Sequence, residues 1–135
     1  MNNSIETSKN QYYTNDHEWI DYQGTVAYIG VCDFKLTGLK SIQKIEYTDL
    51  SKIIRQGEVL ATIFSDDYQI PIHMPVSGRV IENNKKTIHE PGIILQRSVR
   101  DSWLAKIVPL EPYSREGLLT SDQYLSFKKK NKIKK

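Results

Sequence analysis

The sequence predicts a mostly β domain, a small barrel or sandwich, that ends in a C-terminal helix. Short runs of alternating apolar and polar residues recur at near-regular spacing, and turn-forming glycine, proline and asparagine separate them. The 135 residues, 39% of them hydrophobic, suffice for one buried core and are too few for two. We therefore expect a single compact domain.

The first predicted strands form a hairpin. Residues 19–22 and 25–31 have strand character, and Gln23 and Gly24 join them, because glycine adopts a positive φ at little cost. A single helical turn is expected at residues 34–39, and a third strand follows at residues 41–47.

A second hairpin is predicted between residues 59 and 76. In its first strand Val59, Ala61 and Ile63 fall on one face, and the alternation resumes after a turn at residues 65–68. The returning strand contains Pro71, which lacks the amide proton that a central strand needs. We therefore expect this strand to lie at the edge of its sheet or to be interrupted.

The last third of the chain is predicted to be strand, loop, strand and helix. The strands are expected at residues 79–83 and 103–108, with a loop at residues 84–92 between them. Residues 114–127 have an apolar stripe typical of a helix, and Ser121 is a candidate cap for its final part.

The charge is unevenly distributed along the chain. Residues 128–135 hold six of the 19 basic side chains, and the remaining 13 face 16 acidic groups. We expect residues 1–11 to be a polar tail, residues 12–127 the domain, and Lys128–Lys135 a disordered basic tail. Lysines attract phosphates without reading bases, so we do not expect this tail to make the protein a nucleic-acid or membrane binder.

The composition predicts a cytoplasmic protein. The first dozen residues lack the apolar core of a signal peptide, and no stretch is apolar enough to span a membrane. Cys32 is the only cysteine, so no internal disulfide can form. We expect it to be a small buried or half-buried filler rather than a reactive thiol.

Candidate chemistry is sparse. His17 and Glu18 open a segment like the zinc-protease motif, but residue 21 is an aspartate where that motif needs histidine. No nucleophile is paired with a base, and no glycine-rich phosphate loop occurs. We therefore expect no catalytic residue, no enzyme activity, and no metal site at the remaining candidates, which are His73, His89, Asp66 and Asp67.

Several motifs occur in an order typical of one family. The opening Tyr13-Thr-Asn-Asp-His-Glu-Trp-Ile20, the turn Pro75-Val-Ser-Gly78 and the segment Trp103-Leu-Ala-Lys-Ile107 resemble the glycine cleavage system H protein, from about residue 12 to residue 127. The resemblance implies a barrel-sandwich hybrid of the lipoyl/biotinyl-domain type with flanking short helices. It also implies that His17 and Glu18 are structural or cleft residues.

The resemblance fails at the residue that carries the cofactor. Counting back from Pro75, the family's Glu-Ser-Val-Lys-Ala turn falls on Phe64-Ser-Asp-Asp-Tyr68, which puts Asp67 at the lipoyl-lysine position. The nearest lysines, Lys52 and Lys85, are 15 residues before and 18 residues after Asp67. A carboxylate cannot form the amide that attaches lipoate. We therefore expect no lipoate and no other cofactor.

Two loops that are acidic in the family are basic in this chain. The resemblance implies that H proteins meet their enzymes through an acidic surface, so we expect only weak binding to glycine cleavage or lipoate enzymes and a different protein partner. The candidate partner-binding residues are the central turn and the two basic loops: Phe64, Ser65, Asp66, Asp67, Tyr68, Lys85, Lys86, Arg97 and Arg100.

The sequence favours a non-lipoylated binding or scaffold module without carrier activity. Two alternatives stay open. One is an accessory or regulatory component of glycine cleavage or lipoate metabolism. The other is an adaptor whose basic tail binds nucleic acid or an anionic membrane.

Overall fold

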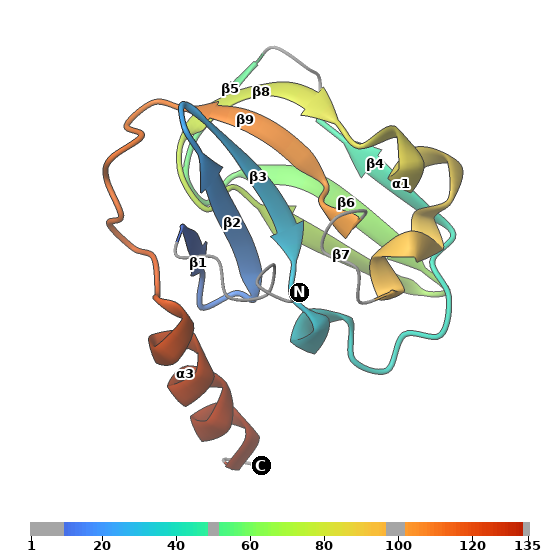
Figure 1. The fold of residues 1–135 in the computed structure, drawn as a ribbon. Coiled ribbons are helices and arrows are strands. Elements are labelled where there is room, and N and C mark those ends of the chain that lie inside the picture. Colours follow the sequence, from blue (N-terminus) through green and yellow to red (C-terminus); the bar gives the residue numbers. More distant parts are fainter. Residues whose placement is uncertain (1–9, 49–51, 97–101, 134–135) are drawn as a thin grey trace, which may run out of the picture.

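The computed structural model describes residues 10–48, 52–96 and 102–133, without the side chains of residues 131–133. Two antiparallel sheets lie one behind the other in Figure 1, and buried side chains from both form a single hydrophobic core. The first sheet has the order β1 (Gln11–Tyr13), β2 (Glu18–Gln23), β3 (Val26–Val31), β9 (Ala105–Pro109), β8 (Gly78–Asn83) and β5 (Ile53–Ile54). The second has the order β4 (Lys44–Tyr47), β6 (Val59–Ser65) and β7 (Tyr68–His73). The prediction of a mostly β domain is confirmed.

The β2–β3 hairpin has the predicted pairing. Gly24 lies in its turn with a φ of 68°, in the left-handed region that glycine favours. Across the same hairpin Gly30 pairs with Trp19, and a Cβ at position 30 would lie 2.2 Å from the indole ring. Glycine at position 30 is therefore what allows Trp19 to pack against the strand.

The β6–β7 hairpin also forms, and β7 is an edge strand of the described three-stranded sheet, as Pro71 predicted. The predicted shared face of Val59, Ala61 and Ile63 is wrong at its first member. A register shift between Val59 and Ala61 marks a β-bulge, so Leu60 and Ala61 are both buried while Val59 is exposed.

The predicted loop at residues 84–92 is wrong, because it contains the helix α1 (Lys85–His89) and the start of the 3-10 helix η3 (Pro91–Leu95). Asn84 caps α1, since its side chain accepts a hydrogen bond from the Lys86 backbone N–H at 3.1 Å. A second 3-10 helix, η2 (Asp33–Leu36), follows β3. It lies at the predicted single helical turn.

The C-terminal helix α3 (Ser121–Ile133) begins later and ends later than predicted. Thr120, not Ser121, caps it. The Gln123 N–H donates to the Thr120 hydroxyl at 3.2 Å, and the Gln123 side chain accepts from the Thr120 N–H at 2.9 Å. Because the helix continues to Ile133, the first residues of the predicted disordered tail are helical.

Two residues of the predicted N-terminal tail belong to the described fold. The Asn10 carbonyl accepts a hydrogen bond from the Tyr22 N–H at 3.0 Å, and Gln11 begins β1. The rest of the predicted tail, residues 1–9, lies outside the described residues. Among the helices that the structure describes, none combines the length and the apolar character needed to cross a bilayer.

Candidate functional site

The β6–β7 turn is the first part of the candidate site. It consists of Asp66 and Asp67, between the paired residues Ser65 and Tyr68. Asp66 has a φ of 51°, a left-handed conformation that aspartate tolerates better than most side chains. Asp66 and Asp67 are exposed, and so is Tyr68, at 64%. The turn therefore presents two carboxylates and a phenol ring to solvent.

Two side chains fix this turn to the segment before β4. The Ser65 hydroxyl donates to the Ser41 carbonyl at 2.6 Å. The Asp66 N–H donates to the Gln43 side-chain carbonyl, and the Gln43 amide donates back to the Asp66 carboxylate at 3.3 Å. Ser65 is fully buried, so its predicted place on a partner-binding surface is wrong. Its hydroxyl instead satisfies a backbone carbonyl.

One lysine lies near the turn in space although it is distant in the sequence. Lys44 on β4 pairs with Phe64, and its Nζ lies 4.8 Å from the centre of the half-buried Phe64 ring. The same nitrogen lies 2.8 Å from a carboxylate oxygen of Glu46. The Lys44 amine is thus held on the strand face. Sequence reasoning missed it because only strand pairing brings β4 beside β6.

The basic residues of the predicted partner surface are only partly described. Lys85 and Lys86 are exposed in the first turn of α1. Arg97 and Arg100 lie outside the described residues.

Helix α1 is attached away from the acidic turn. The hydroxyl groups of Tyr47 and Thr87 lie 2.5 Å apart, which joins α1 to β4. Tyr47 pairs with Ala61, four positions before Ser65 in β6, which is about 13 Å along a strand. The structure therefore anchors α1 toward the opposite end of β6 from the turn.

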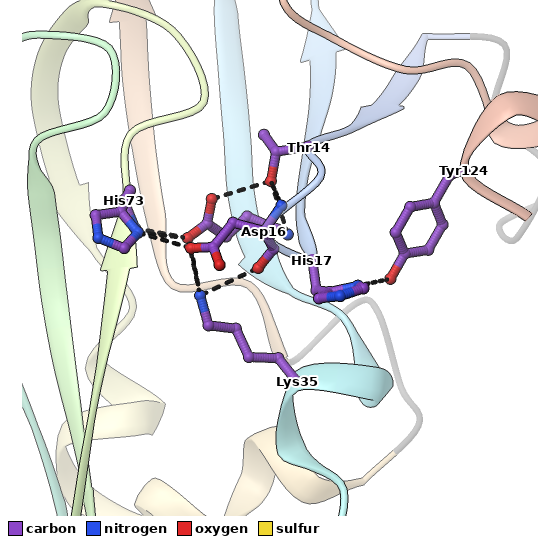
Figure 2. A network of polar contacts seen from close by, with 7 residues as sticks. Thr14, Asp16, His17, Lys35, His73 and Tyr124 are labelled. Carbon is purple, nitrogen blue, oxygen red and sulfur yellow. Dashed lines mark hydrogen bonds and ion pairs between the residues drawn. The ribbon is translucent and has the colours of Figure 1, made fainter. Parts of the chain in front are cut away.

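The second part of the candidate site is a group of ionisable side chains, here named the carboxylate cluster: Asp16, Glu18, Lys35 and His73. Lys35 extends from η2, and its Nζ lies 2.7 Å from Asp16 and 3.2 Å from Glu18 (Figure 2). The Nδ1 atom of His73 contacts the same two carboxylate oxygens, at 2.8 Å from Asp16 and 3.1 Å from Glu18. Three segments distant in the sequence thus meet at two carboxylates.

Burial differs between the two carboxylates. The Glu18 side chain is only 2% exposed, and it accepts hydrogen bonds from the Thr14 hydroxyl at 3.0 Å and the His73 backbone N–H at 2.8 Å. Asp16 is 48% exposed. Partial burial alone would raise the pKa of Asp16, but the hydrogen bond and positive charge of Lys35 outweigh it and lower the pKa below its ordinary value. Asp16 is therefore held as an anion.

His17 lies between Asp16 and Glu18 in the sequence, but it does not belong to the carboxylate cluster. Its φ of 67° is unusual for a side chain other than glycine, and its Nδ1 lies 2.8 Å from the Tyr124 hydroxyl on α3 (Figure 2). Tyr124 also stacks on Tyr13, with ring centres 4.6 Å apart. Burial lowers the pKa of His17, which favours its neutral form. The residue thus helps to attach α3 to the β domain.

Known proteins resemble this chain over most of its length. The sequence model of the family described as "Glycine cleavage H-protein" matches residues 11–131. A probable glycine cleavage system H protein of Aeropyrum pernix is 32% identical over 124 residues, covering 92% of this chain and 87% of that protein. Glycine cleavage system H protein 4 of Aquifex aeolicus is 32% identical over 119 residues, covering 88% and 70%.

The chain belongs to the glycine cleavage H-protein family.

Its fold is that of the family. A crystal structure of a glycine cleavage system H protein from Mycobacterium marinum matches it with a TM-score of 0.75 at 22% identity, covering 91% of this chain and 97% of that one. The predicted lipoyl-domain type of fold is thereby confirmed. H proteins carry a lipoyl group and are not enzymes themselves, so membership assigns this chain no catalytic reaction of its own.

Cys32 does not add a reactive group to this H-protein fold. Burial raises the pKa of its thiol to about 12, so the nucleophilic thiolate is scarce at neutral pH. Its backbone N–H donates to the carbonyl of His17 at 2.9 Å. This agrees with the interpretation of Cys32 as a structural residue.

The H-protein fold also brings together three potential metal ligands. One oxygen from each of Asp16 and Glu18 and one nitrogen of His73 lie within 4.8 Å of one another. No sequence motif marks this group, since His73 lies 55 positions after Glu18. His89, the other isolated histidine, is exposed on α1.

Proposed function

We propose that this member of the H-protein family is a binding or scaffold module that carries no lipoyl group. The observation that carries the proposal is the turn between β6 and β7, where Asp66 and Asp67 occupy the apex. The family resemblance puts Asp67 at the lipoyl-lysine position. Attachment of lipoate forms an amide with a primary amine, and neither turn residue has one. The turn therefore does not fit the cofactor of the family.

Other lysines are poorly placed to replace the missing amine. Lys44 lies beside the turn, but it is on a strand and is held against Phe64 and Glu46. Lys52 and Lys85 flank the lysine-free part of the sequence. Lys52 directly precedes β5, and Lys85 is the first residue of α1. Enzymes that attach lipoate would have to modify a residue outside the hairpin apex.

The turn has features of a protein-binding surface. The hydrogen bond from the Ser65 hydroxyl to Ser41 and that from the Asp66 N–H to the Gln43 side chain fix its backbone. This reduces the entropy lost when a partner binds. Tyr68 presents an aromatic ring of the kind that often dominates binding energy, beside the carboxylates of Asp66 and Asp67. We assign the contact to the exposed or half-buried residues Phe64, Asp66, Asp67 and Tyr68.

The surface charge supports a partner other than the glycine cleavage enzymes. Lys85 and Lys86 are exposed where the family resemblance implies an acidic segment. A partner whose docking site is complementary to acidic groups meets like charge at these positions, which weakens binding and slows association. The partner we propose therefore differs from the enzymes that bind the lipoyl carrier.

Binding to a glycine cleavage T protein tests this proposal. We expect the chain to bind at least about tenfold more weakly than an unlipoylated H protein of an active system, which corresponds to about 1.4 kcal/mol. The variant Lys85→Glu/Lys86→Glu should recover part of the affinity, because it removes the like charge. Calorimetry or surface plasmon resonance measures both effects.

The matched control is Lys129→Glu/Lys130→Glu, which makes the same change in net charge on the exposed face of α3. We expect this control to leave the weak binding unchanged at moderate salt, because exposed charges are screened over about 10 Å. An affinity of the native chain equal to that of the carrier would contradict the proposal.

A further inference from the structure

We propose that the carboxylate cluster binds a divalent transition metal ion, with zinc as the representative ion. The ligands are one carboxylate oxygen each from Asp16 and Glu18 and the Nδ1 atom of His73. In the structure this nitrogen lies 2.8 Å from the Asp16 oxygen and 3.1 Å from the Glu18 oxygen. Two carboxylates and one imidazole are a donor set that zinc accepts when water completes the coordination.

The spacing requires only small movements. Zinc bonds to nitrogen and carboxylate oxygen are about 2.1 Å long, so neighbouring donor atoms in a tetrahedral site lie about 3.4 Å apart. The three donor atoms lie within 4.8 Å of one another, and two of their separations are slightly shorter than the tetrahedral value. Rotation of the exposed Asp16 side chain would widen these separations.

The surroundings provide both support and access. Glu18 is buried, and the Thr14 hydroxyl and the His73 backbone N–H fix its orientation, as outer-sphere groups do in metal sites. Asp16, Glu18 and His73 all line a cavity of about 220 Å³, whose other lining residues include Gln56 and Pro75. The cavity gives an ion a path to the ligands and space for bound water.

Lys35 is the competing cation. Its ammonium group lies within 3.2 Å of both carboxylates, so an incoming ion must displace it. One ammonium group only partly neutralises two carboxylates, whereas a divalent ion neutralises both. The flexible four-carbon stem of lysine allows the ammonium group to move toward solvent when the ion binds. Lys35 therefore lowers the affinity for metal without blocking the site.

This inference reverses the sequence-based expectation that Glu18 is only a structural or cleft residue and that His73 binds no metal. The tertiary fold, and not a sequence motif, brings these side chains together. The fold places the end of the edge strand β7 beside the segment that leads into β2 (Figure 2).

Titration of the full-length, metal-free chain with Zn²⁺ by isothermal calorimetry tests the proposal. We expect one binding site in the native protein and at least about tenfold weaker binding in His73→Gln. The variant Lys35→Met should bind about tenfold more tightly, since it removes the competing ammonium group. The matched control is His89→Gln, which removes an exposed histidine on α1 and should bind like the native chain.

Every result of the zinc titrations either supports or overturns the proposed metal site. Far-ultraviolet circular dichroism of all variants establishes that they are folded, so that a lost binding site is not an unfolded domain. Absence of zinc binding in the native chain overturns the proposal, even if Lys35→Met binds zinc, because the ammonium group would then close the site. Binding that His73→Gln leaves unchanged also overturns it.

Discussion

Replacing Asp67 with lysine is expected to convert the β6–β7 turn into a lipoyl acceptor. Asp67 is exposed, and among the described residues other than glycine only His17 and Asp66 have a positive φ. A lysine at position 67 therefore fits the existing backbone without strain. The hydrogen bonds of Ser65 and Gln43 keep the turn in place. Incubation of Asp67→Lys with a lipoate ligase, lipoate and ATP should yield a modified protein, detected by peptide mass mapping.

Two further variants make this result specific. Asp66→Lys places the amine one position earlier, at the residue whose side chain and backbone bind Gln43, and should be modified far less. Lys44→Arg in the Asp67→Lys background should leave the modification intact. A lipoyl group found on Lys44, or no modification of Asp67→Lys, would show that the turn is not a disabled form of the family's attachment site.

Among substitutions in the carboxylate cluster, removal of the buried Glu18 carboxylate is expected to cause the largest decrease in the free energy of unfolding. In Glu18→Ala the Lys35 ammonium group loses one of its two partners, and the His73 N–H loses its acceptor. Breaking a buried ion pair from one side costs about 3 kcal/mol in the free energy of unfolding, which corresponds to a decrease of roughly 10 °C in melting temperature for a domain of this size. Chemical denaturation and thermal melting measure these quantities.

The neighbouring carboxylate provides the comparison. Asp16 is 48% exposed, so Asp16→Asn should cost less than about 1 kcal/mol. Glu18→Gln keeps the side-chain volume and an acceptor for the Thr14 hydroxyl, and should lie between the two. Equal stability of Glu18→Ala and the native chain would mean that the carboxylate cluster contributes nothing to the fold.

The sequence predicted the strands whose polarity alternates and whose ends carry turn residues. Gly24 marked the β2–β3 turn, and Pro71 correctly predicted an edge strand. Alternation could not predict the bulge after Val59, because an extra residue in one strand leaves no compositional signal. The short helix after Asn84 was missed for a related reason, since five residues are too few to show a helical period.

The two parts of the candidate site differ in how far the sequence could predict them. The acidic turn is local, so the family resemblance located Asp67 without a structure. The carboxylate cluster depends on tertiary contacts, because Lys35 and His73 reach Glu18 from η2 and β7. The burial of Ser65 also overturned one prediction about the turn. Ser65 lies within the turn motif but points into the fold, where its hydroxyl binds the Ser41 carbonyl.

The most direct test of the central claim is the intact mass of the native chain after expression with a lipoate ligase and lipoate. We predict the mass of the unmodified 15.6 kDa polypeptide alone, while an H protein of an active glycine cleavage system, expressed in the same cells, acquires its lipoyl group. A lipoyl adduct on any lysine of the native chain would contradict the account.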